Sequence, residues 1–202
     1  RGAFVNFFNN EGEGESEIVF LNKDRVEVKF LKKVKESEKK KKIELAVCLV
    51  KKNPMEMILQ KAAELGVAKI TPIISERTEI KELNYERANK IAIESIEQSN
   101  QLTPPLISEV IRLNDFINNL SDPTKLLFAD VNSKNNLKQE NLKSEDLQTI
   151  LIGPEGDFSP SERELILGYS NVIPFSLSKN ILRSDTAVIS AISLVNFINN
   201  SH

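Results

Sequence analysis

The feature that most constrains the fold of this chain is an alternation of two hydrophobic periods along residues 43–202. Short apolar runs of strand length are followed by segments whose apolar residues recur at helical spacing, as Met55, Ile58 and Leu59 do. Repeated strand–helix alternation is typical of an α/β domain with a mainly parallel sheet. We predict strands at 43–50, 70–74, 126–129, 150–152 and 172–175, and helices that open at Asn53-Pro54, cover Tyr85 to Ser99, open at Ser159 to Glu162 and cover Thr186 to Asn199.

The first 42 residues differ from the rest of the chain. They contain short apolar runs and a stretch with period-two alternation, Val26 to Phe30, which favours strands. The Asn- and Gly-containing segment Asn9 to Glu15 is typical of a turn. We therefore expect two domains, a small barrel-like β unit at 1–42 that is incomplete at its start, and an α/β domain at 43–202. The polar stretch Asn132 to Asp146 is expected to be a surface loop.

Charge is distributed unevenly between these two regions. Residues 1–42 hold eleven Lys and Arg against eight Asp and Glu, whereas residues 43–202 hold sixteen against twenty-one. The run Lys39 to Lys42 dominates the basic side. A basic unit beside an acidic one suggests that the first contacts nucleic-acid phosphates, although four lysines are also typical of a solvated hairpin turn.

Composition excludes several classes of chemistry. Cys48 is the only cysteine and His202 the only histidine, so an intramolecular disulfide is impossible, a zinc site lacks ligands, and a Cys-His or Ser-His pair is not expected. The strand-like run around Cys48 predicts a buried thiol in a reducing cytoplasm. The longest apolar runs are too short to span a bilayer. The sequence has neither a Gly-x-Gly-x-x-Gly motif after a strand nor a Walker loop, which disfavours dinucleotide binding and nucleotide hydrolysis.

The densest chemical signal is the segment from Leu151 to Ser159. An apolar strand runs directly into Gly153-Pro154-Glu155-Gly156. Glycine lets a ligand approach the backbone closely, and in open α/β sheets ligands bind beyond the carboxyl ends of the strands. This loop is therefore a candidate binding site, although Gly-Pro turns also occur without function.

A second signal covers Phe175 to Ala187. Another strand ends in small polar residues and leads through Ile181-Leu182-Arg183 into the last helix. The planar guanidinium of Arg183 is suited to an anion or a nucleobase, but it could equally form an ion pair with Asp185.

Together these residues resemble a known family. The matching blocks are Lys52 to Met55, Gln60 to Val67 with Ser75 to Arg77, the Gly153–Gly156 loop and Ile181 to Arg183, with a weaker match at Glu97 to Ser99. On these blocks, which span essentially residues 43–202, the chain resembles the bacterial small-subunit (16S) ribosomal RNA methyltransferases that make N3-methyluridine. That family belongs to the SPOUT superfamily, whose α/β domains contain a trefoil knot.

The resemblance implies a fold, a cofactor and partners. It implies a SPOUT domain preceded by a PUA-like RNA-binding β-barrel, a homodimer, 16S rRNA of the small ribosomal subunit as substrate, and neither a metal nor a membrane. It implies S-adenosylmethionine as cofactor, bound by Leu151, Ile152, Gly153, Pro154, Glu155, Gly156, Ser176, Leu177, Ser178, Ile181 and Leu182. The last helix, with Ile189, Ile192, Val195 and Phe197, is expected either to form the dimer interface or to pack in the core.

The expected catalytic residues are Arg183 and Arg77. Uridine N3 must lose a proton to become a good nucleophile, and either guanidinium could stabilise the negative charge that develops on the uracil oxygens. The target base must be unpaired or flipped out of its stack. Glu155 is a candidate general base, but its expected role is to hold the glycine loop.

This chain departs from the family pattern at several positions. Asp157 and Ser178 stand where the family usually has glycine, Asn180 and Asn100-Gln101 stand where it usually has arginine, and Asp185 replaces a glutamate. Two other functions therefore stay open. One is a knotted methyltransferase that acts on tRNA or large-subunit rRNA, and the other is a ribosome-assembly module that binds RNA without catalysis.

Overall fold

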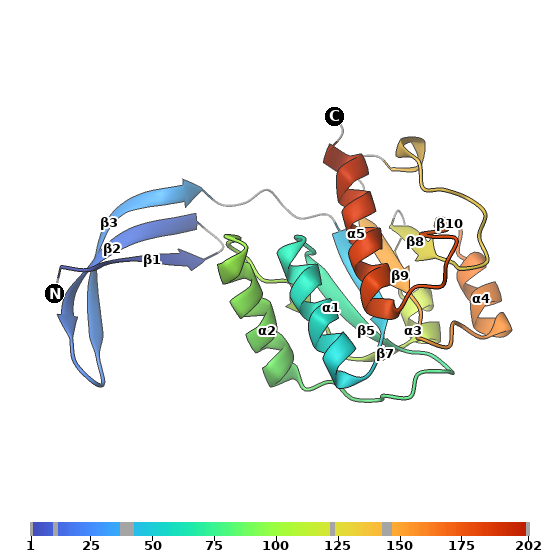
Figure 1. The fold of residues 1–202 in the computed structure, drawn as a ribbon, viewed down its shortest axis with the longest axis horizontal. Coiled ribbons are helices and arrows are strands. Elements are labelled where there is room, and N and C mark those ends of the chain that lie inside the picture. The colour runs from blue at the N-terminus through green and yellow to red at the C-terminus, as the bar shows by residue number, and fades with distance from the viewer. Residues whose placement is uncertain (1, 10–11, 37–42, 122–123, 143–146, 201–202) are drawn as a thin grey trace.

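The computed structural model describes residues 2–9, 12–36, 43–121, 124–142 and 147–200. Two sheets organise the chain, a three-stranded sheet near the N-terminus and a seven-stranded sheet in the larger unit. The small sheet lies beside the α/β unit at its α2 side, and residues 37–42, between them, lie outside the described residues (Figure 1).

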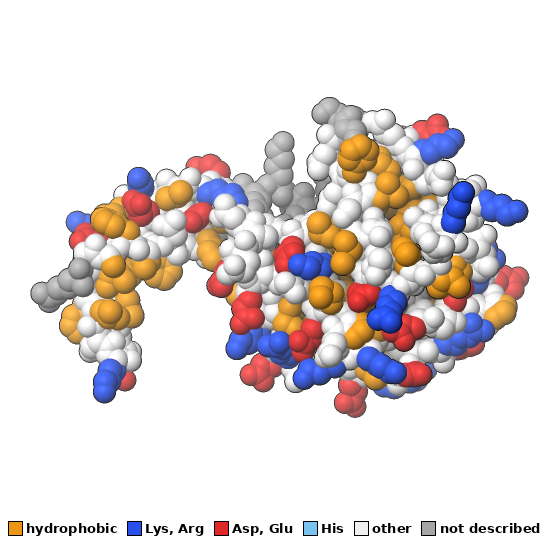
Figure 2. Space-filling view, viewed as in Figure 1, with side chains coloured by type: hydrophobic (Ala, Val, Ile, Leu, Met, Phe, Trp, Pro, Cys, Tyr) orange, Lys and Arg blue, Asp and Glu red, His pale blue; other side chains and the backbone are white. Residues whose placement is uncertain are grey.

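The N-terminal sheet is an antiparallel meander. It consists of β1 (Phe4–Asn9), β2 (Gly12–Leu21) and β3 (Val26–Glu36). The expected turn at 9–15 is too long, because β2 already begins at Gly12 and pairs there with β1. Gly14 lies within β2 and has no side chain because the ring of Phe30 occupies the space that a side chain would fill. Large apolar side chains remain exposed on this sheet, as Figure 2 shows, among them Phe4, Phe7 and Phe30.

The larger sheet is parallel throughout, as the sequence pattern predicts. Its strands are β4 (Ile43–Cys48), β5 (Lys69–Ile74), β6 (Leu106–Ile107), β7 (Ile111–Arg112), β8 (Lys125–Ala129), β9 (Gln148–Ile152) and β10 (Val172–Phe175). The order is β10-β8-β9-β4-β5-β6, and β7 also pairs with β5. The strands β6 and β7, of two residues each, were not predicted because they are too short to show a period.

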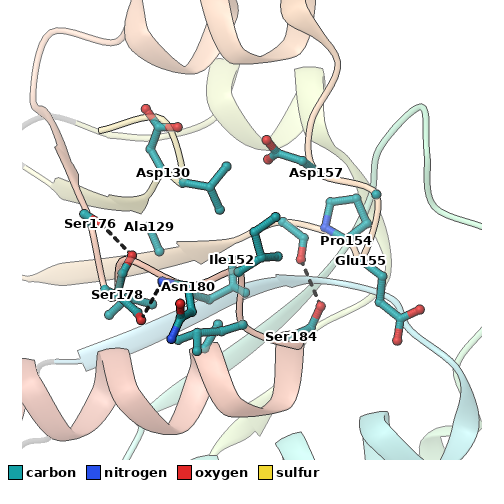
Figure 3. A pocket seen from close by; sticks show the side chains of 17 residues that line it. Ala129, Asp130, Ile152, Pro154, Glu155, Asp157, Ser176, Ser178, Asn180 and Ser184 are labelled. Carbon is teal, nitrogen blue, oxygen red and sulfur yellow. Dashed lines mark hydrogen bonds between the residues drawn. The ribbon is translucent and has the colours of Figure 1, made fainter. Parts of the chain in front are cut away.

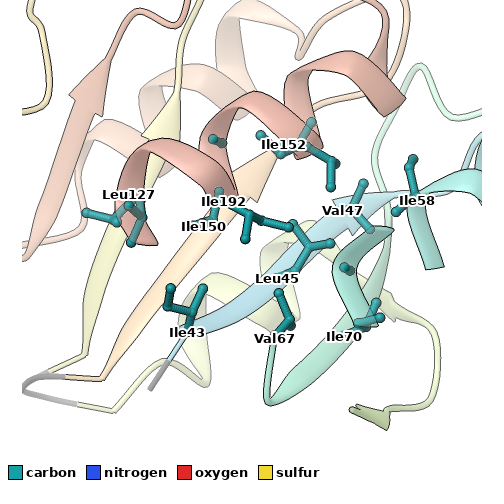
Figure 4. Close-up of a cluster of buried hydrophobic side chains, with 14 of the residues drawn as sticks. Ile43, Leu45, Val47, Ile58, Val67, Ile70, Leu127, Ile150, Ile152 and Ile192 are labelled. Carbon is teal, nitrogen blue, oxygen red and sulfur yellow. The ribbon is translucent and has the colours of Figure 1, made fainter. Parts of the chain in front are cut away.

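Helices cover both faces of this sheet. They are α1 (Lys52–Glu64), α2 (Tyr85–Gln98), α3 (Leu113–Asn118), α4 (Pro160–Leu167) and α5 (Ser184–Asn200). The cluster that contains Leu45, Ile58 and Ile192 joins one face to α1, α2 and α5 (Figure 4). The cluster that contains Ala46, Phe116 and Ile166 joins the other face to α3 and α4.

Local capping explains most helix boundaries. Asn84 accepts a hydrogen bond from Arg87 N, and Ser159 forms a capping box with Glu162, as its sequence predicts. The helix expected to open at Asn53-Pro54 begins earlier, at Lys52, after a Lys51 N-cap that makes no side-chain hydrogen bond. Pro54 is still within the first turn, where its missing N–H leaves no intrahelical bond unmade.

The connection from β8 to β9 is only partly a surface loop. It contains a short 3₁₀ helix, Gln139–Asn141, and the side chains of Leu137 and Leu142 are buried against the main core. Residues 143–146 of the expected loop lie outside the described residues. The Asn135 carbonyl accepts a 2.8 Å hydrogen bond from Ser176 N, so this connection lies against the segment that follows β10.

Candidate functional site

The site lies where three neighbouring parallel strands end. The carboxyl end of β8 adjoins that of β9 on one side and that of β10 on the other. The segments that leave these strands surround one cavity of about 300 Å³ (Figure 3). A cavity at this edge agrees with the general position of ligands in open α/β sheets. It is lined by Ala129, Asp130, Val131, Ile152, Gly153, Pro154, Glu155, Gly156, Asp157, Ser176, Leu177, Ser178, Asn180, Ile181, Leu182, Ser184 and Ala187.

The glycine loop closes as a tight turn. Asp157 N donates to the Pro154 carbonyl at 3.0 Å, and Asp157 itself adopts φ +60°. A Cβ at Gly153 would lie 3.0 Å from the Phe158 ring, so Gly153 is required for close packing. Neither Gly153 nor Gly156 has positive φ. The left-handed conformation that the glycine pattern suggests therefore falls on Asp157, one residue beyond the motif.

Leu151 does not line this cavity. It is fully buried in the cluster between the sheet and α3 with α4. Successive side chains of a strand point to opposite faces, so Ile152 faces the cavity and Leu151 faces away from it. We therefore leave Leu151 out of the candidate cofactor site, while the other ten expected cofactor residues all lie on the cavity wall.

The segment after β10 forms the opposite wall. Ser178 Oγ accepts from Asn180 N at 3.0 Å, and Ser176 Oγ donates to the Ser178 carbonyl at 3.2 Å. At the start of α5, Ser184 Oγ donates to the Gly153 carbonyl at 3.4 Å (Figure 3). This bond joins two segments that are 31 residues apart in the sequence. The two turns singled out in the sequence thus lie side by side around an open space.

The two expected catalytic arginines lie at the edge of the cavity rather than in its wall. Arg183 is exposed between Leu182 and Ser184, and no salt bridge joins it to Asp185 in the described structure. Arg77 reaches back from the turn after β5, where its Nη1 donates to the Gly156 carbonyl at 2.8 Å. Arg77 therefore holds the glycine loop through backbone contacts.

An ion pair supports the part of the cavity wall that follows β8. Arg163 of α4 donates to both carboxylate oxygens of Asp130, with Nη2 at 2.8 Å from Oδ2. Its hydrogen bonds with Asp130 raise the pKa of Arg163 despite the opposing effect of desolvation, and the charge of Asp157 adds to this increase. Asp130 Oδ1 also accepts from Asn132 N, which orders the start of the β8–β9 connection.

Sequence reasoning missed part of the cavity wall. The additional lining residues are Ala129, Asp130, Val131, Asp157, Asn180, Ser184 and Ala187. Asp130 could have been found, because it directly follows a predicted strand, and the carboxyl ends of parallel strands meet at one edge of the sheet. The sequence does not show, however, that this strand lies beside the one that precedes Gly153.

Other features of the described residues bear on the expected chemistry. Burial raises the pKa of the Cys48 thiol to about 12, against weaker hydrogen bonds with Ser75 and Thr78 that lower it. Among the described residues, no group of three or more His, Cys, Asp or Glu side chains could hold a metal ion. No helix within the described ranges has both the length and the apolar character to cross a membrane.

A parallel α/β domain whose strand-end loops enclose a cavity is typical of enzymes that bind a small cofactor. Residues 36–196 match the family model of the RNA methyltransferase domain. Ribosomal RNA small subunit methyltransferase E of Rickettsia conorii is 34% identical over 199 residues, which make up 95% of this chain and 79% of that protein. The protein of the same name from Aquifex aeolicus is 33% identical over 150 residues, or 71% of this chain and 63% of its own length.

A solved structure agrees with these matches. A methyltransferase of Legionella pneumophila, determined in complex with the cofactor S-adenosylmethionine, is 30% identical with a TM-score of 0.82 and covers 98% of this chain and 84% of its own. The chain therefore belongs to the RNA methyltransferase domain family, and within it to the ribosomal RNA small subunit methyltransferase E proteins. The resemblance to the small-subunit rRNA methyltransferases, drawn from the sequence blocks, is therefore confirmed at the level of the family.

Proposed function

We propose that this chain transfers a methyl group from S-adenosylmethionine to uridine N3 in 16S rRNA of the small ribosomal subunit. The observation that carries the proposal is the cavity formed by the glycine loop and the segment before α5, joined by the Ser184–Gly153 hydrogen bond. The name of the Rickettsia relative and the bound cofactor of the Legionella structure support the substrate and the methyl donor.

The cavity has the chemical character that S-adenosylmethionine requires. Apolar side chains such as Ile152, Leu177 and Leu182 offer a surface for the adenine ring, and the turns present backbone groups. The acidic side chain of Asp157 suits the cationic part of the molecule. When bound, S-adenosylmethionine supplies an electrophilic methyl group, so the protein mainly has to orient and select the reactants.

The chain's own residues contribute positioning and charge. In this proposal Arg77 keeps the glycine loop in place through its bond to the Gly156 carbonyl. Arg183, exposed at the rim, stabilises the negative charge on the uracil oxygens when N3 loses its proton. We assign no general base, because Glu155 is exposed and its side chain makes no hydrogen bond or salt bridge within the described ranges that would orient it toward a substrate.

A methyl-transfer assay tests this function. Purified small subunits from cells that lack the enzyme are incubated with the chain and labelled S-adenosylmethionine, and the nucleosides are analysed by mass spectrometry. We expect N3-methyluridine in 16S rRNA, and a loss of about tenfold or more in rate for Arg183→Ala, since the charge it removes develops only in the transition state. Lys90→Ala, an exposed cation on α2, is the control. Full activity of Arg183→Ala would remove Arg183 from the mechanism.

The same assay separates the two alternatives. A knotted methyltransferase with a different substrate would label purified tRNA or large-subunit rRNA instead. A non-catalytic assembly module would label none of them, and calorimetry would show no heat of S-adenosylmethionine binding. The three departures from the family pattern that favour such a module, Asp157, Ser178 and Asn180, all line the cavity, so the binding measurement tests their effect directly.

We further propose that the larger unit is a trefoil-knotted SPOUT domain at 43–202 and that residues 1–42 belong to a PUA-like barrel. The contact between Asn135 and Ser176 supports the knot, because it holds the β8–β9 connection against the segment that leads to α5. The antiparallel three-stranded sheet with exposed apolar side chains supports the second proposal. An experimental structure of the full-length protein tests both proposals.

We also propose a cytoplasmic homodimer. On α5, Ile192 and Val195 are fully buried in the core, whereas Phe197 is 73% exposed, and Ile181 in the preceding loop is 86% exposed. Exposed apolar side chains of this size are typical of an interface. Light scattering coupled to gel filtration measures the mass, and we expect twice the 22.8 kDa of one chain.

A further inference from the structure

The lining of the cavity carries more negative than positive side chains. Three of its lining side chains are carboxylates, those of Asp130, Glu155 and Asp157. The lining contains neither a Lys nor an Arg side chain in the described part of the chain. A ligand that carries a positive charge is therefore favoured over a neutral ligand of the same shape.

One cation compensates part of this charge. Arg163 is bonded to Asp130, whose side chain is 1% exposed, and the pair forms a salt bridge at 2.8 Å. Glu155 and Asp157 take part in no salt bridge within the described ranges. Asp157 is close enough to Arg163 to interact with it, but it makes no hydrogen bond with the guanidinium.

Of the two uncompensated carboxylates, Asp157 is better placed to act on a bound molecule. Its Oδ1 accepts from Phe158 N at 2.8 Å, which fixes the side chain at the end of the glycine loop. In Figure 3 it points toward the side of the cavity where Asp130 lies, whereas Glu155 points away from the cavity. The carboxylate is held without a cationic partner at 4.0 Å or closer.

We infer that Asp157 is a specificity-determining residue that makes the cavity prefer the sulfonium of S-adenosylmethionine over the neutral thioether of S-adenosylhomocysteine. This inference rests on the proposed function. In the reaction the S–CH₃ bond breaks, the N3–CH₃ bond forms, the N3 proton is released and the sulfonium becomes a thioether. The product thus has one positive charge less than the cofactor, and the acidic wall then favours exchange of product for fresh cofactor.

The substitution Asp157→Asn isolates the charge. Asparagine also tolerates φ +60°, and its side-chain oxygen can still accept from Phe158 N, so the loop keeps its shape. Dissociation constants for S-adenosylmethionine and S-adenosylhomocysteine are measured by calorimetry at low ionic strength on both forms of the chain. Glu164→Gln removes an exposed carboxylate from the same region, on α4, outside the cavity lining, and is the matched control.

We expect the preference for S-adenosylmethionine to fall by about threefold to tenfold in Asp157→Asn, mainly through weaker binding of the sulfonium, with no change in Glu164→Gln. The preference of the unaltered chain should also shrink as salt is raised, because salt screens the interaction. If both ligands bind Asp157→Asn with the same ratio as the unaltered chain, the inference is overturned. If the unaltered chain binds neither ligand, the proposed function fails and the inference with it.

Discussion

At the scale of single residues, three positions of the glycine loop have different structural requirements. Gly153 must lack a side chain because Phe158 occupies the space, and the Phe158 ring in turn packs edge-on against Phe128, with centroids 5.7 Å apart. Asp157 supplies the left-handed turn. A Cβ at Gly156 would lie 3.7 Å or more from the Arg77 side chain, which is ordinary contact. The two glycines of the motif are therefore not equivalent.

We predict that Gly153→Ala destabilises the chain far more than Gly156→Ala. The new methyl group at 153 would press on a ring held between other buried groups, and overpacking of this kind costs about 1–3 kcal/mol. At 156 we expect a change within about 0.5 kcal/mol. Urea denaturation gives both free energies of unfolding. Equal effects of the two substitutions would show that the Phe158 contact does not govern the loop.

At the scale of elements, the side chain of Glu162 links the start of α4 to two different backbone groups. Glu162, which is 6% exposed, accepts from Ser159 N through Oε2 at 3.0 Å and from Glu76 N through Oε1 at 2.7 Å. The first bond caps the helix. The second ties the helix to the turn after β5, which also carries Arg77 and its bond to the glycine loop.

Replacement of this carboxylate should therefore weaken both the helix and the loop. We expect Glu162→Ala to lower the free energy of unfolding by about 2–4 kcal/mol, since a cap and a charge-assisted hydrogen bond are lost together. Glu164→Ala on the exposed side of the same helix should change it by less than about 0.5 kcal/mol. Circular dichroism during chemical denaturation measures both, and similar values for the two variants would contradict the dual role of Glu162.

At the scale of the whole molecule, a sheet-rich unit with surplus positive charge accompanies an acidic α/β unit. The lysine run 39–42, which accounts for this surplus, lies outside the described residues. Its proposed role is to contact rRNA phosphates near the site where the base is modified. Such contacts release counterions and therefore make binding depend on salt.

Neutralising Lys39 to Lys42 with glutamine should weaken RNA binding and flatten its salt dependence. For single-stranded RNA the slope of log K against log salt should become less steep by up to about three. Fluorescence anisotropy with a labelled 16S fragment at several salt concentrations measures the slope. Glutamine at Lys90, Lys134 and Lys138, exposed in the larger unit, removes a similar charge as the control. An unchanged slope would assign the lysine run to a solvated connector.

Short-range features of the sequence are enough to predict the local structure and the class of the fold. Hydrophobic period, capping chemistry and the position of glycine act between residues a few positions apart, so the strands around Leu127 and Ile150 and the cap at Ser159 could be predicted. Which segments meet around the cavity could not be predicted in this way. Asp130 joins the cavity, Arg77 turns to the Gly156 carbonyl and Ser184 reaches Gly153 because strands distant in the sequence pair side by side. Such pairings depend on long-range packing, which leaves no periodic signal in the sequence.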